Sequence, residues 1–196
     1  RRLSILKAET FRVLSGIVFY ITLPCIIITC INGVPVTSEM LWLVALGALC
    51  NVLMVVTGYG MTHGKARQER AFSMINLSGY NIGTFAMPFV AGFLPPTGFL
   101  ATCLFDAGNA IMCTGGTYAL ANSVTDASQH LSVKSFLRNV FSSIPFCIYL
   151  IMIVMAFLHL ALPHPVIIFT KIAGDANAFL CMLMIGVNIH LQMDSK

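Results

Sequence analysis

Charged residues are scarce in this sequence. Asp, Glu, Lys and Arg make up 9% of its 196 residues, whereas they make up roughly 25% of an ordinary soluble domain. Hydrophobic residues account for 58% of the chain, and the mean hydropathy is +0.88. This balance excludes a typical soluble globular domain and indicates an integral membrane protein.

Recognisable catalytic motifs are also missing. The seven cysteines form no C-x-x-C pair, and the histidines lie in loops or near the ends of the expected spans. Neither a G-x-S-x-G elbow nor a Walker-type loop occurs. We therefore predict no enzyme activity, no metal site and no bound cofactor. The net charge of +4 follows from the basic loops of a membrane protein and gives no reason to expect a nucleic-acid partner.

Long apolar runs recur along the whole chain. A helix needs about 20 apolar residues to cross a hydrocarbon core roughly 30 Å thick. Backbone polar groups find no water in lipid, so only helices or a closed barrel can span it, and the runs lack the alternating pattern of barrel strands. We predict an all-α, polytopic helical bundle. The expected spans are 13–32, 41–62, 71–94, 97–121, 139–162 and 166–191.

Basic residues set the expected orientation. Lys and Arg cluster before the first span, between the second and third, before the fifth and at the end of the chain. The positive-inside rule then places both ends of this chain in the cytoplasm and predicts a multi-pass protein of the plasma (cell inner) membrane. Lys171 is the exception. An ion pair with Asp175, four residues away, explains it best, and a role lining the outer pathway is the alternative.

The third span contains residues that weaken a helix. Gly79 and Gly83 lower helix propensity, and Pro88 lacks an amide proton and clashes with the preceding turn, which frees backbone groups around Thr84. Transporters use such discontinuous helices to bind substrates and ions. We expect a hinge at the glycines and the proline, with Asn81 and Thr84 as binding side chains. A simple packing kink is the alternative.

The fourth span carries a polar stripe. Five residues recur at steps of four, three, four and four and share one helix face, namely Thr102, Asp106, Asn109, Cys113 and Thr117. An ionised carboxylate near mid-membrane costs on the order of 3 kcal/mol, so such a residue usually marks an ion or substrate path. We predict that Asp106, Asn109 and Thr102 take part in binding. A structural hydrogen bond between Asp106 and Asn109 is the alternative.

Three segments resemble one family. They are the motif Asn81-x-Gly83-x-x-x-x-Pro88, the stretch "RNVFSSIPFCIYLIMIVMAFLHLALPHPV" with its Leu162-Pro163 end, and "LCMLMIGVNI" with Ile185 and Gly186. On these residues the chain resembles the auxin efflux carrier family of membrane permeases. The likeness runs through nearly the whole chain in order. Ala86 and Val140 depart from the family pattern, where glycine and proline are common.

The resemblance implies a ten-helix transporter of two inverted five-helix repeats, in which a broken helix in each repeat crosses the other at mid-membrane. On that map residues 1–121 hold helices two to five of the first repeat. Residues 122–138 form a cytoplasmic linker between the repeats, and residues 139–196 hold the first two helices of the second. This sequence would then be a piece of a longer chain that covers roughly transmembrane helices two to seven. The family also suggests a homodimer.

These observations predict a secondary transporter that moves a small organic anion, such as a carboxylate, by alternating access. Asn81 and Thr84 would supply donors to the anion, and Asp106 would handle a coupling proton or Na⁺. Two alternatives stay open. One is a sodium-coupled symporter of the bile-acid type, and the other is a non-transporting membrane sensor or scaffold module.

Overall fold

A computed structural model gives the fold of residues 8–125 and 133–188. This described part is all-helical, with 85% helix and no strand. The first helix runs without interruption through α1 (Ala8–Ile17), the π-helical turn η1 (Val18–Thr22) and α2 (Leu23–Ile31). Pro24 follows directly after the π-helical turn η1, and Leu23 and Pro24 begin α2.

The second and third helices form a hairpin. A 3-10 turn, η2 (Ser38–Met40), leads into α3 (Leu41–Met61), and α4 (Arg67–Leu77) returns beside it. The chain then opens between residues 78 and 81 before it enters η3 (Ile82–Ala86), a π-helical turn, and α5 (Met87–Phe93). The sequence predicted a discontinuous segment here, and the structure confirms it.

A tight turn at Leu94 and Pro95 joins α5 to the next long helix. This helix comprises α6 (Pro96–Ile111), the π-helical turn η4 (Met112–Gly116) and α7 (Thr117–Thr125). Residues 126–132 lie outside the described ranges. The predicted linker 122–138 is helical at both of its described ends, because residues 122–125 close α7 and residues 133–138 belong to α8.

The last four helices are α8 (Val133–Phe141), α9 (Ile144–Phe157), α10 (His164–Asp175) and α11 (Asn177–Asn188). Span 139–162 was predicted as one helix, and this is wrong in detail, because α8 and α9 meet at an angle of 82°. Pro145 lies in the first turn of α9 and Ser143 is extended, so the helix of α8 cannot continue through this point.

Three helices of the described part are long and apolar enough to cross a membrane, namely Thr10–Ile31, Ser38–Met61 and His164–Val187. They match three of the six predicted spans within a few residues at their described ends. The bent pair of α8 and α9 adds a fourth if it counts as one span. The helix of α6, η4 and α7 is long enough but less apolar, since it contains Asp106 and Asn109.

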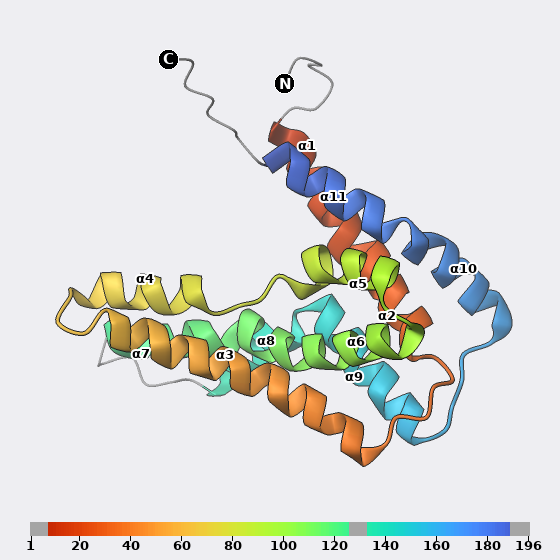
Figure 1. The fold of residues 1–196 in the computed structure, drawn as a ribbon, viewed down its shortest axis with the longest axis horizontal. Coiled ribbons are helices and arrows are strands. Elements are labelled where there is room, and N and C mark those ends of the chain that lie inside the picture. The colour runs from red at the N-terminus through yellow and green to blue at the C-terminus, as the bar shows by residue number, and fades with distance from the viewer. Residues whose placement is uncertain (1–7, 126–132, 189–196) are drawn as a thin grey trace.

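The helices pack in two groups, as Figure 1 shows. In one group α3 lies against α6 and α4, and α4 lies against α7. In the other, α1 and α2 lie beside α11 and α10, and the α1–α11 pair projects away from the first group. The buried core lies where α2, α6 and α9 meet, and its fully buried side chains include Ile27, Leu104 and Tyr149.

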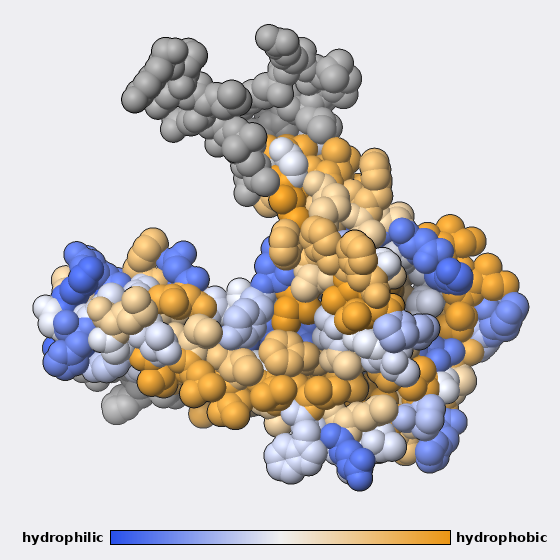
Figure 2. Space-filling view, viewed as in Figure 1, coloured by the Kyte–Doolittle hydropathy of each residue, from blue (hydrophilic) through white to orange (hydrophobic). Residues whose placement is uncertain are grey.

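The outer faces of the helices are apolar. Large side chains such as Trp42, 77% exposed, and Phe93, 83% exposed, point away from the molecule. Figure 2 shows an apolar band along the outer face of α3. A soluble protein rarely exposes so continuous an apolar surface, so this surface fits contact with lipid.

Glycines hold α3 and α6 at close range. A Cβ atom on Gly108 would collide with the Val44 carbonyl oxygen and lie 2.9 Å from the Ala48 nitrogen, and a Cβ atom on Gly47 would collide with the Phe105 carbonyl oxygen. The obstructing atoms are backbone, so no side-chain rotation can relieve the contact. Small residues at helix interfaces allow this approach in membrane proteins.

We expect Gly108→Ala to lower the free energy of unfolding by about 1–3 kcal/mol, because the added methyl group forces α3 and α6 apart. Gly60→Ala on α3 is the matched control, since nothing lies within 4 Å of its Cβ position. Thermal unfolding in detergent, followed by circular dichroism, measures both. Equal stability of the two variants would contradict the close packing.

Candidate functional site

The site is built around the gap between α4 and η3. The α4 helix ends at Leu77, Ser78 is extended, and Gly79 adopts a left-handed conformation with φ of +82°. Glycine takes this conformation without steric cost. The gap therefore lies at residues 78–81, earlier than the expected position around Thr84.

The proline is accommodated differently from the prediction. Pro88 lies in the first turn of α5, and the preceding residues form the π-helical turn η3. In this turn the amide of Ala86 donates to the carbonyl of Asn81 at 3.3 Å. Thr84 is therefore helical and buried. π-turns occur frequently at functional sites. The gap and η3 therefore mark this region as the candidate functional site.

Two asparagine side chains bind the backbone that the gap leaves without helical partners. The Gly79 amide donates to Oδ1 of Asn51 at 2.7 Å. The Tyr80 amide donates to Oδ1 of Asn109 at 3.2 Å, and Nδ2 of Asn109 donates to the Tyr80 carbonyl at 2.9 Å. Asn109 thus pairs with Tyr80 as a neighbouring strand would. Both asparagines are buried, at 0% and 3% exposure.

The two asparagines also bond to each other. Nδ2 of Asn51 donates to Oδ1 of Asn109 at 3.0 Å and to the Gly47 carbonyl of its own helix at 2.9 Å. Cys113 adds a contact from its sulfur to Oδ1 of Asn109 at 3.2 Å. The α3 and α6 helices are therefore joined by polar groups at the point where their glycines bring them together.

Asp106 lies next to this cluster and is 6% exposed. Nδ2 of Asn109 donates to its Oδ1 at 2.8 Å, and the Tyr149 hydroxyl of α9 donates to its Oδ2 at 2.8 Å. A Cβ atom on Gly83 would lie 3.4 Å from the same Oδ2. The carboxylate is thus held between α6, α9 and η3, and both of its oxygens accept a hydrogen bond.

The other predicted site residues are divided between this cluster and its surroundings. Thr84 is buried and its hydroxyl bonds to Oδ1 of Asn81, whose side chain is exposed. Thr102 donates to the Gly98 carbonyl of its own helix at 2.9 Å. Thr102 therefore makes no hydrogen bond to Asp106 in the described contacts, and its predicted role in binding stays a prediction.

Sequence reasoning missed Asn51, Tyr149 and Ser78. Ser78 donates to Oγ1 of Thr117 at 3.2 Å and so ties the end of α4 to the polar stripe of the α6–η4–α7 helix. Asn51 could have been found, because a lone amide in the apolar run of α3 is costly in lipid unless it is bonded. Tyr149 gave no such signal, because tyrosine is common in apolar helices.

A shallow, open depression of about 390 Å³ lies beside the gap. Aromatic and aliphatic side chains line most of it, and the Tyr80 and Phe105 rings on its wall have centroids 6.3 Å apart. Asn81 is among its lining residues, but the surface that lines the depression is entirely apolar. The depression thus offers only apolar contact surface beside the gap.

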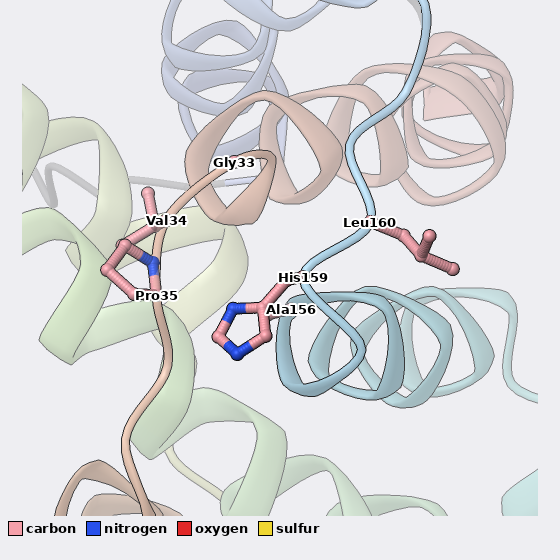
Figure 3. A pocket seen from close by; sticks show the side chains of 6 residues that line it. All are labelled: Gly33, Val34, Pro35, Ala156, His159 and Leu160. Carbon is pink, nitrogen blue, oxygen red and sulfur yellow. The ribbon is translucent and has the colours of Figure 1, made fainter.

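A second, smaller cavity of about 110 Å³ lies between the loop after α2 and the end of α9. Figure 3 shows the His159 ring pointing toward Val34 and Pro35. His159 has φ of 54°, and the Leu160 amide donates back to the Met155 carbonyl at 2.9 Å. This is the Schellman arrangement that closes many helices, so the left-handed residue is explained by helix capping.

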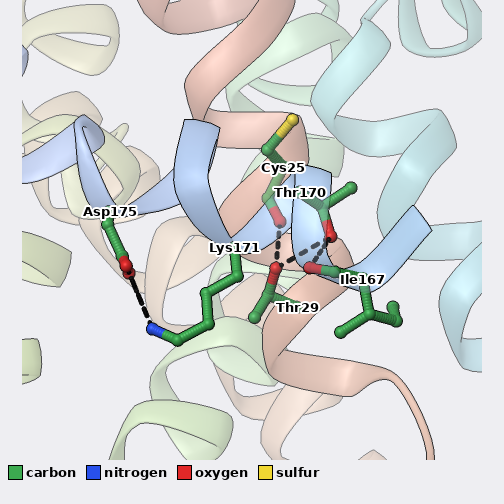
Figure 4. Close-up of polar contacts among 6 residues, drawn as sticks. All are labelled: Cys25, Thr29, Ile167, Thr170, Lys171 and Asp175. Carbon is green, nitrogen blue, oxygen red and sulfur yellow. Dashed lines mark hydrogen bonds and ion pairs between the residues drawn. The ribbon is translucent and has the colours of Figure 1, made fainter. Parts of the chain in front are cut away.

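A separate polar contact joins the first and last helices. The Thr29 hydroxyl lies 3.1 Å from that of Thr170, as Figure 4 shows. Thr22 of η1 donates to Oδ1 of Asn177 at 2.8 Å. The predicted ion pair of Lys171 and Asp175 is confirmed at 3.0 Å, and both side chains are more than half exposed, at 63% and 67%. Figure 4 shows this pair apart from the threonines.

Within the ranges 8–125 and 133–188, no three His, Cys, Asp or Glu side chains converge as a metal site would require. Comparisons of the chain with family models, with curated proteins and with solved structures find no match.

We expect Asn109→Ala to destabilise the protein strongly, because it leaves both peptide groups of Tyr80 and one oxygen of Asp106 without their partner. Each buried polar group left unpaired costs about 1–3 kcal/mol. Asn76→Ala is the control, since Nδ2 of Asn76 is exposed and bonds to the Phe72 carbonyl of its own helix. Thermal unfolding in detergent compares the two. A smaller loss for Asn109→Ala than for Asn76→Ala would contradict the assigned role.

Proposed function

We propose that this protein is a secondary transporter of the cell inner membrane that moves a small organic anion, such as a carboxylate, by alternating access. The observation that carries the proposal is the open backbone at residues 78–81 beside the buried carboxylate of Asp106. Interrupted helices at membrane depth are tolerated where they meet protein or a water-filled cavity, and they recur at transporter binding sites. On this proposal the remaining predicted spans also cross the bilayer, within the inverted-repeat architecture that the family resemblance implies.

Asn81 is proposed to meet the anion. It is the exposed side chain of the gap, and its apolar atoms border the shallow depression beside the gap. The side-chain amide of Asn81 can donate to a carboxylate, while its Oδ1 still accepts the hydrogen bond from the Thr84 hydroxyl. The apolar surface of the depression would contact the rest of a small organic molecule.

Asp106 is proposed to carry the coupling proton on Oδ2. Nδ2 of Asn109 can only donate, so Oδ1 must remain an acceptor in that bond. The Tyr149 hydroxyl can either donate or accept, so it can stay bonded to Oδ2 when that oxygen gains a proton. A Cβ atom on Gly83 would come within 3.4 Å of the same oxygen, so η3 passes close to the proposed protonation site and a change of charge there can alter the position of η3. Na⁺ in place of the proton is the sodium-coupled alternative.

A structural function is the second candidate, because the polar atoms of Asp106, Asn109 and Asn51 already have partners inside the protein. In that case the cluster joins α3, α6, α9 and the gap at residues 78–81 in a membrane sensor or scaffold. It predicts no gradient-driven flux.

Transport by the full-length protein in proteoliposomes separates the two candidates. Uptake of radiolabelled lactate and succinate is measured with and without an imposed pH gradient, and again with a Na⁺ gradient. We expect Asp106→Asn and Asn81→Ala each to lower gradient-driven uptake at least tenfold, because the first fixes the charge state and the second removes a donor. Asp175→Asn, which alters an exposed carboxylate, is the control and should keep the native rate.

Native rates in both site variants would refute the site assignment. Absence of flux by the native protein under every gradient, with either anion, would favour the structural candidate. Loss of the pH dependence in Tyr149→Phe with retained binding of the anion would support the role given to Oδ2.

A further inference from the structure

The short helix α8 has two distinct faces. At 100° per residue its apolar residues fall in one arc of the helix, and its polar residues fall in the opposite arc. The apolar residues are Val133, Phe136, Leu137, Val140 and Phe141, and the polar residues are Lys134, Ser135, Arg138 and Asn139. No residue of either type lies in the wrong arc, so α8 is strongly amphipathic.

One half of the apolar face packs on the protein. A Cβ atom on Gly115 of η4 would lie 3.0 Å from Cδ2 of Phe136 and 3.2 Å from Cγ2 of Val140. Val140 is 3% exposed as a result. The packing fixes how α8 is rotated about its axis, and it turns the remaining apolar residues outward.

The other half of the apolar face is exposed. Val133, Leu137 and Phe141 repeat every four residues, and they are 68%, 45% and 53% exposed. Lys134 and Arg138 lie beside this strip, one turn apart, at its edge with the polar face. Neither has an acidic partner in the described ranges, where the ion pairs join Lys65 to Glu69 and Lys171 to Asp175. The strip thus combines apolar contact area with unbalanced positive charge.

The bend at residues 142–143 fixes the direction of this helix. The α9 helix has 14 residues without a charge, and it is the apolar member of the pair. The 14 residues of α9 extend only about 21 Å, so α9 by itself is shorter than the hydrocarbon core. With the axis of α9 along the bilayer normal, an angle of 82° lays α8 nearly parallel to the membrane surface. Four of the nine residues of α8 are polar, so it cannot lie within the hydrocarbon, whereas an interfacial position satisfies both of its faces.

We propose that α8 is an interfacial helix that binds anionic phospholipids. Val133, Leu137 and Phe141 enter the acyl-chain boundary, and Lys134 and Arg138 bind headgroup phosphates from the edge of that strip. The leaflet is the one on the side of the basic loops. This inference does not depend on transport, because it uses none of the residues around the gap.

The depth of the helix can be measured by tryptophan fluorescence. The chain has one tryptophan, so Trp42→Phe gives a silent background in which Leu137→Trp and Asn139→Trp are compared. In phosphatidylcholine vesicles with phosphatidylglycerol, brominated acyl chains should quench the tryptophan at position 137, and aqueous iodide should quench the one at position 139. Phe141→Trp repeats the first measurement if Leu137→Trp loses its helical circular dichroism signal.

Quenching of position 137 by iodide would overturn the proposal, because the strip would then face water. Shielding from both quenchers would also overturn it, because the strip would then be covered by protein.

Headgroup preference tests the basic residues. The ratio of quenching by brominated phosphatidylglycerol to quenching by brominated phosphatidylcholine should favour the anionic lipid. It should fall roughly fivefold for each charge removed in Lys134→Gln and Arg138→Gln. Lys171→Gln on α10 is the matched control and should leave the ratio unchanged. A double variant with the native ratio would overturn the assigned lipid contact.

Discussion

The structure depends on how the peptide groups of Gly79 and Tyr80 are satisfied without water. A helix supplies these bonds from its own backbone, and the gap after α4 removes them in the middle of an apolar protein. Asn51 and Asn109 replace them with side-chain bonds of 2.7–3.2 Å. The gap can therefore exist only where α3 and α6 place both amides at the same depth, and the close packing at Gly47 and Gly108 is what places them there.

The same bonds connect the gap to the one buried carboxylate among the described residues. Asn109 holds Tyr80 with its amide and also donates to Asp106, and Tyr149 brings α9 to the other carboxylate oxygen. A change at Asp106 thus acts on two donors that belong to different helices. Its other neighbour is Gly83, which lies in η3. This connection is the physical basis on which protonation and helix position can be coupled in the proposed carrier.

The described residues contain three π-helical turns, and each lies at a junction between segments. Thr22 of η1 bonds to Asn177 at the junction of α10 and α11, and Thr84 of η3 bonds to Asn81 at the gap. In η4, the Phe136 and Val140 side chains of α8 pack against Gly115. A π-turn shifts the helical register by one residue, so it re-aims side chains that an α-helix would direct elsewhere. The local residues of these turns are not strong helix formers, since η3 and η4 contain glycines and η1 is VFYIT, but nothing in the sequence marks a π-turn rather than an α-helical turn.

The sequence by itself determined the all-helical class, three apolar spans predicted at 13–32, 41–62 and 166–191, and the weakness of the helix at Gly79. The structure has these spans at 10–31, 38–61 and 164–187. These features follow from composition, run length and the conformational freedom of glycine, which act locally. The tertiary structure decided that the gap lies at residues 78–81, that Asn51 and Tyr149 complete the cluster, and that α8 turns 82° away from α9. These outcomes depend on which helix faces lie opposite each other, and distant segments supply the hydrogen-bond partners that make one arrangement lowest in free energy.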